Sequence, residues 1–326
     1  MKRIKNNLGI AALCSLGVAG LSTNVHAAWP ENVAFSGNLG LEGEWNSGYG
    51  DADSSMDLII GSFTIGLDAE LNDRVSTHIG FLYEEDGSGS FDFDTGYLSL
   101  DVTDTVNIML GKMVVPFGSF NSVMVKDPFA LALGETNETA AAVNFNMGMA
   151  ELTAYIFNGD HHEDEESMDS VGFRITGGSD AVSFTFDYMN NLNDRGEPYA
   201  DTAGTDFVGG MSVGATASIS GFDVNLEYLA ALDEITTTTA AGKEPNSFQL
   251  EVSMNSGNES DCYYGIGIQQ SEDAEGVLPE TRFSFGYGRT LMDAISLSTE
   301  LYFDSDYEDA TDESATGFIA RIDASF

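Results

Sequence analysis

The chain has almost no cysteine and little positive charge. Among its 326 residues are 2 cysteines and 12 lysines or arginines, against 53 aspartates and glutamates, for a formal net charge of −41. Two cysteines allow one internal disulfide at most, so cross-links are not the main source of stability. The shortage of basic residues excludes binding to nucleic acid through basic patches, and we expect no nucleic-acid partner.

Long apolar runs are also missing. Beyond the first 27 residues no stretch holds twenty successive apolar residues, so no helix is expected to cross a membrane. Disorder is excluded as well, because 21 phenylalanines and 12 tyrosines accompany acidic residues that are spread along the chain. The composition therefore favours a folded, strongly acidic protein.

The first residues, MKRIKNNLGIAALCSLGVAGLSTNVHA, begin with basic side chains, continue with a short apolar run and end in a small residue. This order is typical of a cleaved export signal. We predict a signal peptide over residues 1–27, cut after Ala27, and one exported domain over residues 28–326. Cys262 is the single cysteine of that domain and has no partner for an internal disulfide.

Apolar residues then alternate with polar ones in many short segments. Such alternation predicts strands with one apolar and one polar face. Two segments show it clearly, with apolar sets Val33, Phe35, Leu39, Leu41 and Trp45 in one and Ile59, Phe63, Ile65, Leu67, Ala69 and Leu71 in the other.

Short connections alternate with long polar ones, as in transmembrane barrels with short periplasmic turns and long external loops. We therefore predict an all-β fold, a transmembrane up-and-down antiparallel β-barrel of about 16 strands. A soluble β-sandwich would show the same alternation, but it would not need this loop asymmetry or so few lysines. The long connections are expected near 46–56, 84–90, 117–138, 159–169, 190–205, 232–246, 271–279 and 304–315.

The third long connection carries the most distinctive local pattern, GKMVVPFGSFNSVMVKDPFALALGETNET. Pro116 and Gly118 end a strand, and the residues after them are too apolar for a loop in water. We expect this loop 3 to fold into the barrel and narrow the pore. Capping of the rim, or packing against a neighbouring subunit, is the alternative. The charged residues expected at the constriction are Lys126, Asp127, Glu135 and Glu138.

Inward-facing positions of the predicted strands are mostly acidic. Rings of like charge set the selectivity of a pore, so an acidic lumen predicts a preference for cations. A phosphate-selective pore would need rings of lysine or arginine, which the sequence does not supply. The residues expected to carry lumen charge are Glu42, Glu44, Asp68, Glu70, Arg174 and Arg289.

Few residues are suited to a metal or to catalysis. His161 and His162 lie in the acidic stretch GDHHEDEES and form a weak candidate metal site, for which a solvated charge run is the alternative. His78 falls on the polar face of a predicted strand, with no nucleophile motif nearby. We expect a hydrogen-bonded lumen histidine there, no cofactor and no enzymatic activity.

The stretch GKMVVPFGSF, followed by DPFALALGETNETA, resembles the LbtU-type siderophore porin family of bacterial outer membranes. The resemblance is specific around residues 111–140 and extends in outline over the exported chain, including the terminal Phe326. It implies outer-membrane localisation in a Gram-negative-type envelope and transport of a siderophore or iron chelate. No ligand-contacting residue can be transferred from it.

Together these observations predict an outer-membrane porin, a cation-preferring channel for passive or facilitated diffusion of small solutes. Its expected partners are outer-membrane lipid, lipopolysaccharide and small solutes or iron chelates. Porins of this size often trimerise, which leaves a homotrimer open. The alternative function is a structural or adhesive surface barrel whose lumen is blocked.

Overall fold

The computed structural model describes residues 30–50, 52–85, 89–159, 168–179, 181–192, 207–235, 242–256, 262–307 and 313–326. The expected signal peptide, residues 1–27, lies outside these ranges. Among the described residues, no helix is long and apolar enough to cross a membrane.

Strands make up nearly all of the regular structure, and the connections alternate between long and short as the sequence predicts. One short helix interrupts them. The elements are β1 (Val33–Asn46), β2 (Ser55–Asn72), β3 (Val75–Tyr83), β4 (Phe91–Thr103), β5 (Val106–Val114), α1 (Phe129–Gly134), β6 (Asn137–Asn146), β7 (Ala150–Phe157), β8 (Ser170–Ser179), β9 (Val182–Met189), β10 (Gly210–Ile219), β11 (Phe222–Ala231), β12 (Asn246–Asn255), β13 (Cys262–Glu272), β14 (Thr281–Met292), β15 (Ile295–Ser305) and β16 (Ser314–Ser325).

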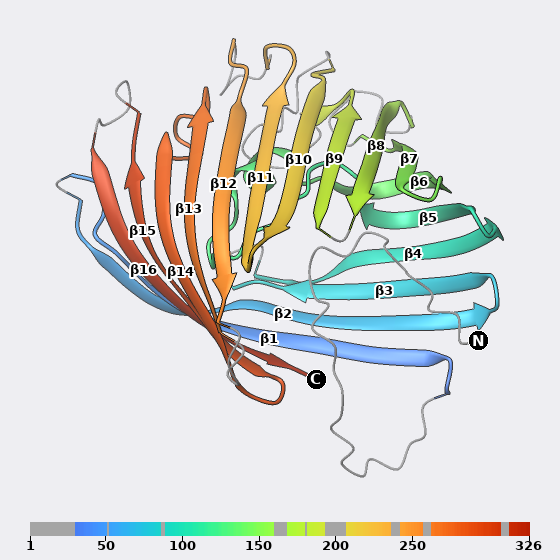
Figure 1. Cartoon of the computed structure of the whole chain (residues 1–326), viewed down its shortest axis with the longest axis horizontal. Helices are drawn as coiled ribbons and strands as arrows, with labels where there is room; N and C mark the ends of the chain where they lie inside the picture. The colour runs from blue at the N-terminus through green and yellow to red at the C-terminus, as the bar shows by residue number, and fades with distance from the viewer. Residues whose placement is uncertain are drawn as a thin grey trace.

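Each strand pairs antiparallel with the next, and β1 pairs antiparallel with β16, so the sheet closes into a barrel (Figure 1). The predicted fold class, a 16-stranded antiparallel up-and-down barrel, is confirmed. Closure satisfies the backbone groups that an open sheet would leave unpaired at its two edges.

The two faces of the barrel wall differ sharply. Large apolar side chains such as Phe35, Ile266 and Phe285 are exposed on the outer face. The polar and charged side chains of the same strands alternate with them and point inward, because neighbouring residues of a strand face opposite sides. A soluble sheet would bury this apolar face, so its exposure is typical of a wall in contact with lipid.

A bulge in β2 changes one prediction about these faces. Gly40 pairs with Ser62, but the next residue, Leu41, pairs with Ile60, so Gly61 is an extra residue. The bulge reverses the alternation on one side of Gly61. Ile59 pairs with Glu42 on the inner face, and the prediction that it shares the outer face with Phe63 is wrong.

The closing seam between β1 and β16 ends in a tight contact at Gly37. The Gly37 N–H donates to the Phe326 carbonyl (2.9 Å), and the Phe326 N–H donates to the Gly37 carbonyl (3.0 Å). The Phe326 ring lies beside Phe35, with ring centroids 6.1 Å apart. A Cβ atom at Gly37 would overlap that ring, so the glycine provides the space in which the ring lies against the wall.

We expect Gly37→Val to destabilise the barrel by about 1–3 kcal/mol, because the added methyl groups displace the Phe326 ring. Urea unfolding in detergent, followed by the heat-modifiable mobility of the folded barrel, measures the effect. Gly43→Val is the matched control on the outer face of β1, since a Cβ there comes no closer than 3.8 Å to any atom. Equal unfolding midpoints for the two variants would contradict this role of Gly37.

Candidate functional site

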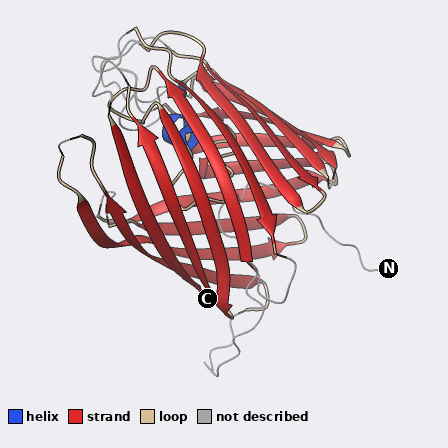
Figure 2. Ribbon diagram, turned by 60° about the vertical axis from the view of Figure 1, so that its left-hand side comes forward, coloured by secondary structure: helices blue, strands red, loops and turns tan. Residues whose placement is uncertain are grey.

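Loop 3, residues 115–136 between β5 and β6, is the longest described connection and contains α1. The Val115 N–H donates to the Thr136 carbonyl (2.8 Å), which closes the base of the loop. Val115, Phe117, Phe129 and Leu133 are buried. Helix α1 contacts β11, β12 and β13 and is enclosed by the ring of strands (Figure 2).

Carboxylates on the inner wall hold the first part of loop 3. The Gly118 N–H donates to Asp187 Oδ2 on β9 (2.8 Å). The N–H groups of Ser119 and Phe120 donate to the two oxygens of Glu227 on β11, at 2.6 and 2.8 Å. Asp187 is 0% exposed and Glu227 is 1% exposed, so loop 3 covers both carboxylates completely.

The same arrangement continues along the wall. The Val123 N–H donates to Glu251 Oε2 on β12 (2.9 Å). The N–H groups of Val125 and Lys126 donate to Glu300 Oε2 on β15, at 2.8 and 2.7 Å. Because its partners come from β9, β11, β12 and β15 in turn, loop 3 follows the inner wall over this half of the barrel.

Backbone strain accompanies the contact with Glu227. Phe120 has a φ of 50° and Gly118 a φ of 76°, both in the left-handed region. That conformation is costly for a bulky residue such as Phe120. It lets successive N–H groups converge on one anion, an arrangement that binds carboxylates and phosphates. The carboxylate of Glu227 fills this concave site, which stabilises the strained loop.

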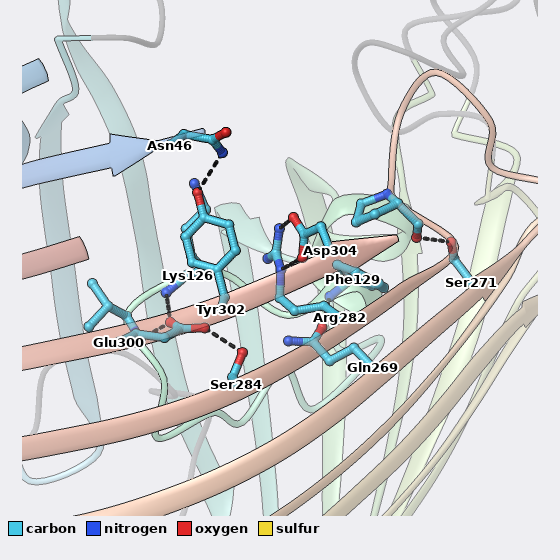
Figure 3. A network of polar contacts seen from close by, with 12 residues as sticks. Asn46, Lys126, Phe129, Gln269, Ser271, Arg282, Ser284, Glu300, Tyr302 and Asp304 are labelled. Carbon is cyan, nitrogen blue, oxygen red and sulfur yellow. Dashed lines mark hydrogen bonds and ion pairs between the residues drawn. The ribbon is translucent and has the colours of Figure 1, made fainter. Parts of the chain in front are cut away.

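The end of this path reaches β1. Lys126 Nζ lies 2.8 Å from Glu44 Oε1, and their side chains are 28% and 30% exposed. The Tyr302 hydroxyl also donates to Glu44. The same hydroxyl accepts from Asn46 Nδ2 (2.8 Å) (Figure 3). Lys126 therefore places a partly accessible positive charge against the inner wall beside β16.

Arg282 of β14 anchors α1. Its guanidinium forms two hydrogen bonds with Asp304, at 2.8 and 2.9 Å. It also lies 5.1 Å from the ring centres of both Phe129 and Tyr302, so it is stacked between the helix and the wall (Figure 3). The Phe129 N–H donates to Gln269 Oε1 on β13 (2.7 Å). These contacts fix the first residue of α1.

Two further arginines face the interior and are paired. Arg174 on β8 forms hydrogen bonds with both oxygens of Asp187 at 2.9 Å. Arg321 on β16 lies 2.9 Å from Glu42 and 2.9 Å from Asp323. The inward cations are therefore each held by at least one wall carboxylate.

The predicted site residues lie in different parts of the structure, some on the inner face of the strands and others in loop 3. Alternation places the predicted lumen carboxylates Glu42, Glu44, Asp68 and Glu70 on the inner face, together with Arg174. Among the predicted constriction residues, Lys126, Asp127 and Glu135 lie in loop 3. Glu138 lies on β6 and shares the inner face with the buried Ala140.

Arg289 is misplaced in the prediction. It pairs with Leu297 and lies an even number of residues after the exposed Phe283 and Phe285, so it shares their outer face, near the end of β14. The inward arginine of this strand is Arg282, seven residues earlier and therefore on the opposite face. Placing the two phenylalanines on the outer face would have assigned Arg289 to that face and Arg282 to the inner face from the sequence.

The sequence did not reveal the roles of other inward residues, because alternation predicts which face a residue lies on but not its partner. Glu251 and Glu300 are buried acceptors for loop 3, and Arg321 pairs across the seam. Their partners are distant in sequence, at separations of 128, 175 and 279 residues, respectively. His161 and His162 lie outside the described residues, and within the described ranges no group of three metal-binding side chains occurs.

Loop 3 leaves the opposite wall uncovered. The inward side chains Asp187, Glu227, Glu251 and Glu300 are at most 1% exposed. On β1 and β2, inward residues including Ser36 and Asp68 remain exposed. On β3 and β4 the inward His78 and Tyr97 are partly exposed, so the accessible part of the interior runs along β1–β4.

Comparisons with known proteins agree with this fold. No family model matches the chain. The sequence is similar to a UPF0422 protein of Legionella pneumophila, 21% identical over 323 residues and covering 84% of this chain and 59% of the relative. A UPF0422 protein of Coxiella burnetii is 28% identical over 223 residues, with 61% of this chain and 47% of the relative covered. The chain thus spans about half the length of these relatives.

The fold is also similar to solved porins. An anion-selective porin from Comamonas acidovorans matches with a TM-score of 0.68 at 13% identity, covering 90% of this chain and 99% of the porin. The outer-membrane channel DcaP of Acinetobacter baumannii matches with a TM-score of 0.64 at 13% identity, covering 90% and 97%. These similarities support a porin-like barrel, and they do not support the LbtU-type name.

We expect Glu227→Gln to loosen loop 3, because one oxygen acceptor becomes an NH₂ group facing backbone N–H donors. A hydrogen bond to a charged group contributes about 1.5–3 kcal/mol, so amide hydrogen exchange over residues 118–123 should accelerate at least tenfold. Asp223→Asn is the control on the same strand, since Asp223 bonds Ser218 and Asn255 but no loop 3 residue. Equal acceleration in both variants would refute the specific role of Glu227.

Proposed function

We propose that the protein is a porin-type channel of the outer membrane that lets small solutes diffuse through its interior. The observation that supports this most is a closed barrel with an apolar outer face, in which loop 3 covers one side of the interior and leaves the β1–β4 wall accessible. Export through a signal peptide over residues 1–27 is part of the proposal.

A lipid environment follows from the outer face. Exposed phenylalanines, leucines and isoleucines cover it on strands all around the barrel. In water such an apolar surface would drive aggregation, whereas in a bilayer it contacts lipid tails. The closed sheet pairs its own backbone groups, as a membrane requires. Outer-membrane lipid and lipopolysaccharide are the partners we propose, and a homotrimer is the assembly that comparable porins suggest.

We propose a modest preference for cations. Where loop 3 reaches β1, at Lys126, the carboxylates Glu42, Glu44 and Asp323 are balanced in large part by Lys126 and Arg321. The carboxylates beneath loop 3 are covered and hydrogen-bonded, so they contribute little to the accessible charge. The exposed carboxylates Asp68 and Glu70 on the inner face of β2 leave the accessible interior negative, which favours cations over anions.

The cargo proposed from the family resemblance is a siderophore or iron chelate. Its support is the sequence pattern around residues 111–140, which falls on loop 3 and its flanking strands. Growth on ferric chelates as the sole iron source, with and without the protein, tests this cargo. Equal growth would exclude it while leaving a general porin intact.

A second function, a structural or adhesive barrel with a blocked lumen, is favoured by one observation. Apolar side chains inside the barrel form a buried cluster that includes Met113, Phe117, Phe157 and Leu229. This cluster fills the interior beside β5–β11. If it extended across the lumen in the membrane, no ion would pass.

Planar-bilayer recording separates the two functions. The porin predicts discrete open levels of the purified protein and a reversal potential of cation-selective sign in a salt gradient. Silence of correctly folded protein would support the blocked barrel instead. A reversal potential of anion-selective sign would refute the charge assignment while leaving the channel.

We expect Lys126→Met to strengthen cation preference, because Glu44 loses its positive neighbour in loop 3. The permeability ratio of potassium to chloride should rise by roughly twofold in the same recordings. Lys243→Met is the matched control. Lys243 lies in an outer connection, where its hydrogen bond lowers the pKa of Glu275. An unchanged ratio in Lys126→Met would show that Lys126 is not at the constriction.

A further inference from the structure

The β1–β4 wall is lined by small side chains, in contrast with the wall beneath loop 3. Cross-strand pairs on its inner face include Ser36 with Gly66, and Gly66 with Gly80. Gly80 in turn pairs with Thr95 of β4. Small residues at adjacent inward positions leave space in front of the wall. A larger ionisable side chain there is therefore accessible to a solute in the lumen.

Asp68 and His78 stand next to these glycines. They are cross-strand partners on β2 and β3, and His78 Nδ1 lies 2.8 Å from Asp68 Oδ1. A carboxylate only accepts hydrogen bonds, so Nδ1 carries the proton. The Asp68 side chain is 59% exposed and the His78 side chain 27% exposed. This makes Asp68 far more accessible than the carboxylates beneath loop 3.

The imidazole is fixed on the wall. Its ring stacks on Tyr97 of β4, with centroids 5.2 Å apart and an interplanar angle of 26°. A Cβ at Gly80 would lie 2.3 Å from Thr95 Oγ1 and 3.2 Å from His78 Nε2, so a side chain there would crowd both residues. The charged or titratable groups that face His78 are Asp68 on β2, Tyr97 on β4 and Asp94 on β4, with Glu70 two residues from Asp68 on the same face.

We propose that the Asp68–His78 pair is a specificity-determining site of the channel, which attracts cations while His78 is neutral and loses that attraction when His78 is protonated. The proposal rests on the proposed channel function. Loop 3 is therefore not the only element that sets selectivity, because the accessible carboxylate lies on the wall that the loop leaves uncovered.

The sign of the pH effect follows from the charges. With neutral His78 the pair carries one negative charge, and with protonated His78 it carries none. Imidazole side chains change charge at roughly pH 6.5, whereas exposed carboxyls do so near about 4.

The test is the reversal potential of the full-length channel in a potassium chloride gradient at about pH 7.5 and 5.5. For the unchanged protein, the permeability ratio of potassium to chloride should fall by roughly twofold on acidification. Asp68→Asn should have a lower permeability ratio than the unchanged protein at both pH values. His78→Gln should keep the higher ratio at both pH values, because its side chain cannot gain a proton.

Asp73→Asn is the control, since it removes an exposed carboxylate from the turn between the same two strands. It should leave both the ratio and its pH dependence unchanged. Conducting channels in which Asp68→Asn and His78→Gln behave as the unchanged protein would overturn the proposed site while leaving the channel function. Folded but silent protein would overturn the channel function, and the site with it.

Discussion

Pairing of β1 with β16 is the constraint on which the rest of the structure depends. It makes the sheet endless, so every strand has a neighbour on both sides and the outer face can be apolar without an exposed edge. The same closure creates an interior into which alternate side chains must point. A chain with 53 acidic residues then has to accommodate many carboxylates in a confined space.

Backbone N–H groups of loop 3 stabilise several of these inward carboxylates. Asp187, Glu227, Glu251 and Glu300 are covered by loop 3 and accept hydrogen bonds from its N–H groups. An unpaired buried charge would be strongly unfavourable, whereas a carboxylate with several donors is stabilised. These acidic side chains hold the loop and are not available to solutes. Net charge alone is therefore a poor measure of the charge that a diffusing ion meets.

The fold followed from sequence because strand alternation and loop lengths are local signals. Sixteen strands, their antiparallel order and the distinctive third loop could all be predicted from them. The failures have equally local causes. Gly61 adds one residue and moves Ile59 to the inner face, and a miscounted alternation put Arg289 in place of Arg282. Contacts such as that between Phe120 and Glu227 join residues 107 apart in sequence, and no periodic pattern encodes such a pairing.

The two halves of the interior differ in accessible charge, and this difference bears more directly on selectivity than the average charge does. One half is covered by loop 3 and α1, and ion pairs where the loop reaches β1 bring carboxylates and cations together. The other half has small residues and an accessible Asp68. Because exposed charges farther apart than roughly 10 Å are largely screened at ordinary salt, an ion responds to the nearest accessible groups. Selectivity should therefore depend on a few residues of the uncovered wall and on Lys126 of loop 3, whatever the total charge of the chain.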